Sequence, residues 1–374
     1  MEDVKVLLDM GERLKRVFRV SSAGYRSRNT IGTVLLSAFF WQGANAGLEV
    51  QSELVFEPGH PTLKSFLLPD QPVAPSHNLT TPARVELGKT LFFDPRLSAN
   101  GNMSCATCHN PSLGWSDGLP TGRGHNGREL DRATPTVINT AFNSIQMWDG
   151  RAPSLEAQAL GPLEAKVEMA ADFDAVFELL TQTQGYVDAF EAAYPGEEIS
   201  KETIGKAIAA FERTVVSNNS PFDQWIRGDA QAMNAQQVRG FSLFMNPAKG
   251  NCAECHSGAN FTDNSFHNLG LQSSLGPDAD LGRFNEKPIG ILRSAFKTPT
   301  LRDIDLTAPY FHDGSANTLK EVMVHYVNGP VDGASASPAF KPSNLTDAEQ
   351  DDIVAFMQAL TGETSLVSLP VLPY

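Results

Sequence analysis

Apolar residues recur at helical spacing in three stretches that also carry helix-start signals. Thr81 with Pro82 forms an N-cap and a first helical position, and Asn234 can cap a second helix. Thr346 and Glu349 form a capping box before a third helix. The apolar faces that follow are Val85, Leu87, Leu91 and Phe92, then Val238, Phe241, Leu243 and Phe244, then Ile353, Val354, Phe356, Met357 and Leu360. We expect Gly362 to end the third helix.

The other stretches carry weaker patterns. Helical periodicity with acidic faces runs over residues 173–211, which favours a mainly α protein. Residues 53–77 are Pro-rich without a clear period and predict an extended arm. Residues 217–228 are a candidate crossing between domains, and the Gly- and Asp-rich residues 269–287 predict a surface loop.

A short cysteine motif follows each of the first two predicted helices. The two motifs are Cys105-Ala-Thr-Cys108-His109 and Cys252-Ala-Glu-Cys255-His256. This C-x-x-C-H pattern predicts covalent haem attachment, in which two thiols bond the haem and the adjacent His ligates the iron. A four-cysteine zinc site or two redox-active pairs are the alternatives. Neither explains why a His follows both pairs.

The two halves of the chain share further matches in one register. Thr134-Pro135-Thr136 is answered by Thr298-Pro299-Thr300, and Asp149-Gly150 by Asp313-Gly314. Leu155 and Leu319 each lie six residues beyond that Asp. The halves are therefore interpreted as diverged copies of one unit. We expect a mainly α fold with two cytochrome c-like haem domains in tandem.

The same register shows where the copies differ. Tyr326 lies seven residues beyond Leu319, on a helix expected over residues 318–326, and its counterpart is Pro162. If this position faces the haem, the second iron is offered a phenol oxygen and the first iron is left open. The alternative is that Tyr326 is an ordinary core residue. Met323 and His325 are competing ligands on the same helix.

Three polar or aromatic residues of the first half are candidates for the chemistry of an open haem. Trp148 could relay electrons between the two haems, although a Trp is commonly a core residue. Gln158 and Glu168 could border the open haem, and the alternative for both is a solvated surface position.

Charge and the N-terminal sequence narrow the setting. The formal charge of the 374-residue chain is -14, and after the first 46 residues, with seven basic and four acidic, 22 basic and 39 acidic residues remain. This acidic balance argues against nucleic acid and favours a basic partner. Arg26 and Arg28, the apolar residues 31–41 and the small-residue pattern ending at Ala46 predict a cleaved export signal. We expect no membrane span in the mature protein. Residues 1–25 form either an amphipathic helix or an extension before a true start at Met10.

The sequence resembles the bacterial di-haem cytochrome c peroxidases and their MauG-type relatives. The resemblance covers roughly residues 87–362. Besides the two cysteine motifs and the Thr-Pro-Thr repeat, its motifs are Trp148-Asp149-Gly150-Arg151, Glu156-x-Gln158-Ala159-x-Gly161-Pro162, Val167-Glu168-Met169 and Thr307-Ala308-Pro309-Tyr310-Phe311-His312.

The resemblance implies a division of labour between the two haems. It predicts a peroxidatic haem domain over residues 81–225 and an electron-transfer haem domain over 226–374. The export signal and the Pro-rich stretch add a leader over residues 1–46 and an arm over 47–80. Glu168 and Gln158 would line the distal pocket of the first haem, and Trp148 would lie between the haems. A calcium ion would bind the carbonyl oxygens of Thr307 and Pro309.

The chain departs from the ordinary peroxidases in three places. At the second haem, Tyr326 stands where they carry Met, as in MauG-like proteins. His125 matches a His that caps the first haem in many resting peroxidases, and the alternative is a solvent-facing loop His. Ala133 replaces an Asn that usually donates to calcium, which questions the affinity for that ion.

These features predict a periplasmic enzyme with two covalent haems c that reduces hydrogen peroxide and draws electrons from a small basic cytochrome c or copper protein. MauG-like oxidation of a partner protein is a further expectation, and a homodimer is left open. The alternative function is a plain electron-transfer di-haem cytochrome, with both irons ligated on both sides, for instance by His109 and His125.

Overall fold

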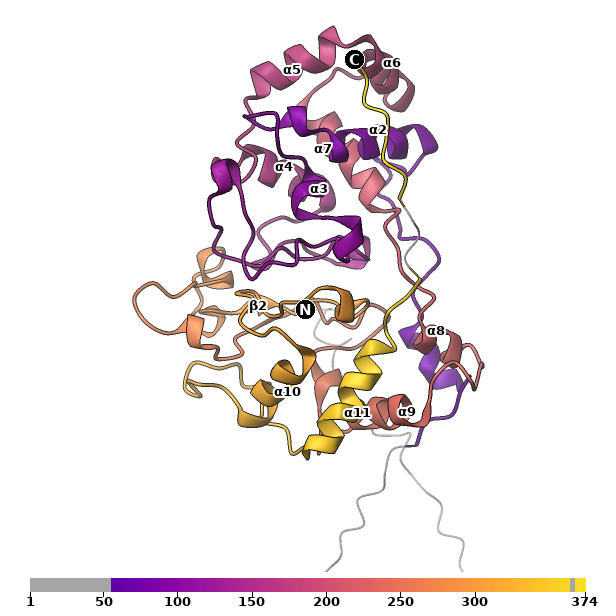
Figure 1. The fold of residues 1–374 in the computed structure, drawn as a ribbon, viewed down its shortest axis with the longest axis vertical. Coiled ribbons are helices and arrows are strands. Elements are labelled where there is room, and N and C mark those ends of the chain that lie inside the picture. Colours follow the sequence, from indigo (N-terminus) through magenta and orange to yellow (C-terminus); the bar gives the residue numbers. More distant parts are fainter. Residues whose placement is uncertain (1–54, 364–366) are drawn as a thin grey trace, which may run out of the picture. The chain divides into compact units, whose positions relative to one another are not determined.

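The computed structural model describes residues 55–363 and 367–374, and the predicted leader over 1–46 lies outside them. This part of the chain is mainly helical (Figure 1), as expected. Its α-helices are α2 (Pro82–Phe93), α3 (Cys105–Cys108), α4 (Leu155–Glu164), α5 (Phe173–Gln182), α6 (Gln184–Ala193), α7 (Lys201–Glu212), α8 (Pro221–Ile226), α9 (Ala235–Met245), α10 (Leu319–Asn328) and α11 (Asp347–Gln358).

Short elements fill the long connections between the helices. Strands β1 (Phe266–His267) and β2 (Phe296–Lys297) pair antiparallel, with Phe266 opposite Lys297. The 3₁₀ turns are η1 (Pro61–Phe66), η2 (Pro95–Leu97), η3 (Pro111–Leu113), η4 (His125–Gly127), η5 (Thr140–Phe142), η6 (Cys252–Glu254), η7 (Gln272–Ser274), η8 (Arg283–Asn285), η9 (Gly290–Leu292) and η10 (Ile304–Leu306).

The predicted helix starts are confirmed. The Thr81 and Asn234 side chains accept hydrogen bonds from backbone amides in the first turns of α2 and α9. Thr346 and Glu349 form the expected capping box of α11. The predicted end at Gly362 is wrong, because α11 stops at Gln358 and the amide of Gly362 instead donates to the Asp303 carboxylate.

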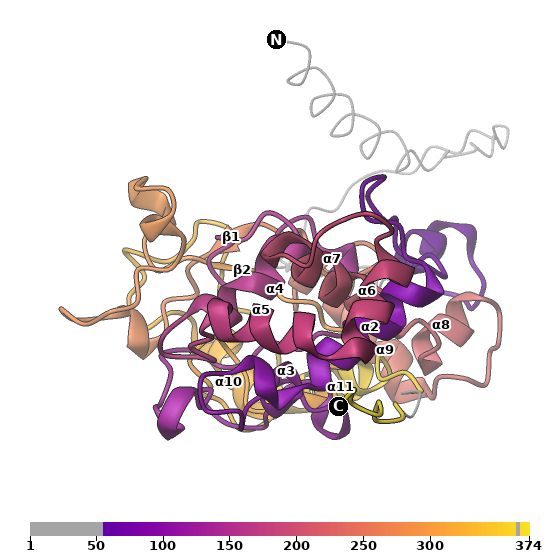
Figure 2. The same cartoon turned by 90° about the horizontal axis from the view of Figure 1, so that it is seen from above.

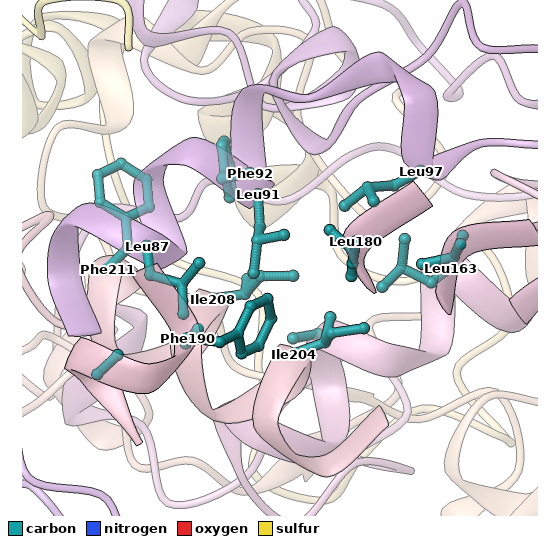
Figure 3. Close-up of a cluster of buried hydrophobic side chains, with 14 of the residues drawn as sticks. Leu87, Leu91, Phe92, Leu97, Leu163, Leu180, Phe190, Ile204, Ile208 and Phe211 are labelled. Atoms are coloured by element: carbon teal, nitrogen blue, oxygen red, sulfur yellow. The ribbon is translucent and has the colours of Figure 1, made fainter. Parts of the chain in front are cut away.

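Each half of the chain has its own hydrophobic core, built around a pair of crossing helices. In the first half α2 packs on α7, with α4 and α6 beside them (Figure 2). In the second half α9 packs on α11. Glycine permits both crossings: a Cβ on Gly88 would collide with the carbonyl oxygen of Ala207, and one on Gly240 with that of Asp352. Figure 3 shows the first core, where Leu91 and Ile208 face each other across the pair.

The two ends of the described chain cross over between the cores. In the arm, Leu63 and Phe66 of η1 are buried in the second core. Near the C-terminus, Val367 packs on the first core. The predicted crossing over residues 217–228 holds α8, whose Phe222 and Trp225 belong to the second core. The N-terminal arm therefore contributes to the core of the second half, and the C-terminal residues pack on the core of the first half.

The internal repeat predicted from the sequence is confirmed by local geometry. Helices α4 and α10 are both ten residues long and begin at Leu155 and Leu319. Antiparallel bridges join Gln146 to Ala152 and, at the equivalent positions, Tyr310 to Ala316. Pro162 and Tyr326 thus occupy the same position in corresponding helices.

The prediction of a surface loop over residues 269–287 is wrong for part of that segment. Arg283 is buried and donates two hydrogen bonds, to the carbonyl oxygens of Asp149 and Gly150. Asp280 forms an ion pair with Arg132. The segment therefore ties the second half to the first, through buried polar contacts that composition does not reveal.

Among the residues that the structure describes, no helix combines the length and the apolar composition needed to span a bilayer.

The crossing glycines predict the sign of a stability change. Gly240→Ala should lower the free energy of unfolding by about 1–3 kcal/mol, because the added methyl group meets a backbone carbonyl that cannot move freely. Gly161→Ala, in α4, is the control, since its Cβ would meet only the flexible end of Met147. That control should be neutral or stabilising, because Ala is the better helix former. Chemical denaturation of both variants measures the difference, and a stabilising Gly240→Ala would contradict the helix contact.

Candidate functional site

The first cysteine motif forms a short helix that presents its histidine to a cavity. Within α3 the amide of His109 donates to the carbonyl oxygen of Cys105. The His109 ring donates from Nδ1 to the carbonyl oxygen of Trp115 at 3.2 Å. Burial lowers the pKa of His109, so the ring is neutral and Nε2 carries a free lone pair. A neutral imidazole held in this way is a preformed iron ligand.

The second motif repeats the arrangement. The His256 ring donates from Nδ1 to the carbonyl oxygen of Phe261 at 3.0 Å, and burial again lowers the pKa of the imidazole. Trp115 and Phe261, the two acceptors, both have positive φ angles, 59° and 49°. This uncommon backbone conformation in both copies aims the carbonyl at the histidine ring.

The residues present fit two c-type haems. Cys105, Cys108 and His109 line one cavity, which we call the first cavity. The second cavity is lined by Cys252, Cys255 and His256. All four cysteines are free thiols. Because the cysteine pairs open on different cavities, the donors suit two separate groups and not one four-cysteine zinc site.

The first cavity gathers the distal residues that the sequence predicts. Gln158, Pro162 and Glu168 line it together with His109. Burial raises the pKa of Glu168, and the charge of Arg151 works against that rise. A carboxyl with a raised pKa is suited to exchanging protons near neutral pH.

The second cavity holds both tyrosine and methionine candidates. Tyr326 and Met323 line it. Burial, followed by the charges of Cys252 and Cys255, raises the pKa of the Tyr326 phenol. His325, the third candidate on this helix, differs from Tyr326 and Met323 because its Nε2 donates a hydrogen bond to the carbonyl oxygen of Leu269 at 3.0 Å. The histidine candidate is therefore occupied elsewhere.

Trp148 lies where the two halves of the chain meet, a boundary that we call the seam, and it lines both cavities. Its indole donates to the carbonyl oxygen of Ala133 at 2.9 Å. The backbone amide of Ala133 donates to the carbonyl oxygen of His312, and the backbone amide of Lys297 donates to the carbonyl oxygen of Trp148. By the repeat register Trp148 corresponds to His312, and Ala133 to Lys297, so the two backbone bonds are equivalent across the seam.

His312 was not assigned a role beside the haems by sequence reasoning. It lines both cavities, its ring centroid lies 6.5 Å from that of Trp148, and it stacks on Phe296 at 3.5 Å. Burial lowers its pKa to about 4, so the ring is neutral. The repeat register carries the signal that could have found it, since both aromatic rings precede Asp-Gly.

A second residue missed from the sequence is Glu212, at the end of α7. Its carboxyl is buried, and burial raises its pKa to about 8. It lines both cavities. The glycine crossings meet Ala207 and Phe211 in α7 and Asp352 and Phe356 in α11, and this alignment makes Met357 the counterpart of Glu212. Only the pairing of α7 with α11 reveals this acid.

Two predicted sites remain predictions. His125 begins η4, and its amide donates to the carbonyl oxygen of Val167, but among the described residues it is not part of the lining of either cavity. Thr307 and Pro309, the candidate calcium ligands, line the second cavity, as does Ala133.

Comparison with known proteins assigns the class. The family profile described as "Di-haem cytochrome c peroxidase" matches residues 82–231, and the profile "Cytochrome c" matches residues 237–361. The chain belongs to the family of di-haem cytochrome c peroxidases and MauG. It is a mainly α di-haem oxidoreductase with two cytochrome c-like domains, each for one c-type haem.

The similar proteins include both MauG proteins and cytochrome c peroxidases. The chain is 46% identical to methylamine utilization protein MauG of Methylorubrum extorquens, over 82% of this chain and 86% of the relative. It is 35% identical to cytochrome c551 peroxidase of Pseudomonas aeruginosa, over 92% and 94%. A solved MauG-like protein associated with microbial copper homeostasis superposes with a TM-score of 0.73 at 32% identity, covering 79% of this chain and 95% of that one.

The cysteine motifs predict the haem content. A pyridine haemochrome assay should give two haems per wild-type chain. Cys255→Ala should remove one thioether bond and shift the haemochrome band of that haem, because one vinyl group then stays unsaturated. Glu254→Ala, an exposed position inside the same motif, should leave the spectrum unchanged. One haem per wild-type chain would contradict the two-site account.

Proposed function

We propose that this protein is an exported di-haem peroxidase in which hydrogen peroxide reacts at the first haem and electrons pass through the second. One observation carries the proposal: Pro162 and Tyr326 occupy equivalent positions in α4 and α10. Proline offers no ligand atom, whereas tyrosine offers a phenol oxygen. One iron is then open to a small molecule and the other is closed.

At the first site the chain supplies proton transfer and positioning. A bound c-type haem supplies an iron that accepts peroxide and exchanges electrons. Glu168 takes a proton from peroxide and returns it to the leaving oxygen, and Gln158 orients the molecule by hydrogen bonding. Support comes from the shared cavity and from the raised pKa of the Glu168 carboxyl.

At the second site Tyr326 would be a further ligand of the iron that His256 holds, since both residues line the same cavity. Burial raises the pKa of the phenol, so its proton leaves only when a metal cation replaces it. An anionic oxygen donor favours the higher oxidation states of iron, whereas a thioether favours the lower ones. This preference supports MauG-like oxidation of a partner protein in addition to the removal of peroxide.

Trp148 is the proposed electron relay between the sites. The indole borders both cavities, and its N–H is held by the carbonyl oxygen of Ala133. A fixed aromatic ring between two redox centres shortens each electron-transfer step. The His312 ring lies across the seam from Trp148 and is neutral, so it adds no positive charge beside the indole.

The partners follow from charge and from the relatives. The acidic balance of the chain favours a small basic cytochrome c or copper protein as the electron donor. The names of the relatives, cytochrome c551 peroxidase and MauG, support peroxide and a protein substrate respectively. The export pattern before Ala46 supports the periplasm. Calcium at the carbonyl oxygens of Thr307 and Pro309, and His125 as a resting-state ligand of the first iron, belong to the same proposal.

Glu168→Gln should slow the bimolecular reaction with peroxide by ~10²- to 10⁴-fold, because the amide cannot carry the proton. The haem spectra should stay nearly unchanged. In the wild type the rate should rise with pH through an inflection above the usual glutamate value, since only the carboxylate accepts a proton and burial raises its pKa. Stopped-flow mixing with peroxide measures both effects.

Glu164→Gln is the matched control for that experiment. Glu164 is exposed near the end of α4 and pairs with Lys201. Its loss should leave the peroxide rate at the wild-type value. An unchanged rate in Glu168→Gln would remove Glu168 from the mechanism.

Replacement of Tyr326 should change the second haem alone. Tyr326→Phe should remove its low-spin ferric signal in electron paramagnetic resonance, and Tyr326→Met should raise its reduction potential, because a thioether favours ferrous iron. Met323→Leu is the control and should leave the signal in place. If Met323→Leu removes the low-spin signal while Tyr326→Phe does not, Met323 is the ligand and the protein is of the ordinary peroxidase type.

A further inference from the structure

Lys297 is a buried cation without an acidic partner among the described residues. Its exposed fraction is 8%, and its ammonium makes one hydrogen bond, to the carbonyl oxygen of Thr298 at 3.1 Å. The other buried cations are better satisfied. Lys206, Arg213 and Arg302 each pair with a carboxylate, and Arg283 donates to two carbonyl oxygens.

An unpaired ammonium in the protein interior is costly. Desolvation favours its neutral form, and burial lowers the pKa of Lys297 to about 8. The negative charge of Asp263 works against that shift. The Asp263 carboxylate is already engaged by His267 at 3.0 Å and by the amide of Ser265 at 2.8 Å. Among the described residues, two N–H donors of the Lys297 ammonium therefore have no hydrogen-bond partner.

The position of Lys297 shows where a partner would come from. Lys297 lines the second cavity together with His256 and Tyr326. Its backbone amide donates to the carbonyl oxygen of Trp148 at 2.7 Å, so β2 lies at the seam between the halves (Figure 1). Cys252, by contrast, lies on η6, which packs on α9 within the second core. Cys252 and Lys297 thus border the cavity from different elements.

A c-type haem has an acidic edge that suits this arrangement. Its thioether bonds form at the vinyl-bearing pyrroles, and its two propionate carboxylates extend from the other two pyrroles. With the vinyl-bearing pyrroles tied to Cys252 and Cys255, the propionates would be free to meet a cation elsewhere on the cavity wall. A carboxylate there would give the ammonium a charge-assisted hydrogen bond.

We propose that Lys297 binds a propionate of the second haem and fixes that edge of the haem against the seam beside Trp148. The ion pair places a positive charge near the second iron. Its repeat counterpart at the first haem is Ala133, which offers no charge. The same structural position thus distinguishes the two haems electrostatically.

The pair should set the reduction potential of the second haem. A nearby cation disfavours the ferric state, so Lys297 opposes the preference of an anionic Tyr326 ligand for higher oxidation states. A unit charge about 10 Å from the iron, at an effective dielectric constant of ~20, changes the ferric-to-ferrous equilibrium roughly tenfold. This inference rests on the presence of the second haem and not on the reaction with peroxide.

The test is spectroelectrochemical titration of the holoprotein. Lys297→Met should shift the second haem to lower potential by about tenfold in the equilibrium constant, or ~59 mV for one electron. Lys297→Gln, which keeps a polar side chain without the charge, should shift it in the same direction. Lys297→Arg should restore most of the potential. Lys287→Met, which removes an exposed lysine from a nearby loop, is the control and should change nothing.

Resonance Raman spectra provide a second readout. A propionate bending band of the second haem should move in Lys297→Met and remain in Lys287→Met. Wild-type potentials in both charge-removing variants would overturn the proposal, and so would a shift confined to the first haem. The haemochrome assay keeps the two questions apart, because two haems with an unmoved potential refute the role of Lys297 alone.

Discussion

The arrangement of both candidate haem sites depends on one hydrogen bond in each half, from the histidine of the cysteine motif to a backbone carbonyl oxygen. His109 and His256 follow their cysteines directly, so their place on the chain is fixed by the haem tether. The acceptors Trp115 and Phe261 hold Nδ1 and leave Nε2 for the iron. Helices α4 and α10 contribute residues to the same cavities, Pro162 to the first cavity and Tyr326 to the second. In the proposed function, the residue that faces each histidine across the cavity then decides whether the iron is open to a small molecule.

The two halves share a repeated fold but carry unequal side chains at equivalent positions. The backbone bonds at the seam are equivalent in both directions, and the crossing helices meet at a glycine in both cores. The side chains at equivalent positions are not. These unequal pairs are Pro162 and Tyr326, Trp148 and His312, Ala133 and Lys297, and Glu212 and Met357. In the proposed function, these few differences distinguish an open site from a closed one.

The sequence predicted what local chemistry determines. Helix caps at Thr81, Asn234 and Thr346 were found because capping depends on neighbouring residues, and the repeat register was found because motifs keep their spacing. The burial of Phe66 in the second core and of Arg283 at the seam could not be found, because both depend on contacts between distant segments. The end of α11 was misplaced because Gly362 serves a contact with Asp303 instead of a helix cap.

The central claim is that one iron is open and the other is closed by a residue of α10. Binding of carbon monoxide to the fully reduced protein tests it most directly, because the ligand occupies only an iron with a free or weakly held position. The account predicts one carbon monoxide per chain, bound at the haem beside Pro162. No binding would indicate a di-haem electron carrier with both irons ligated on both sides, and two per chain would show that Tyr326 does not close the second site.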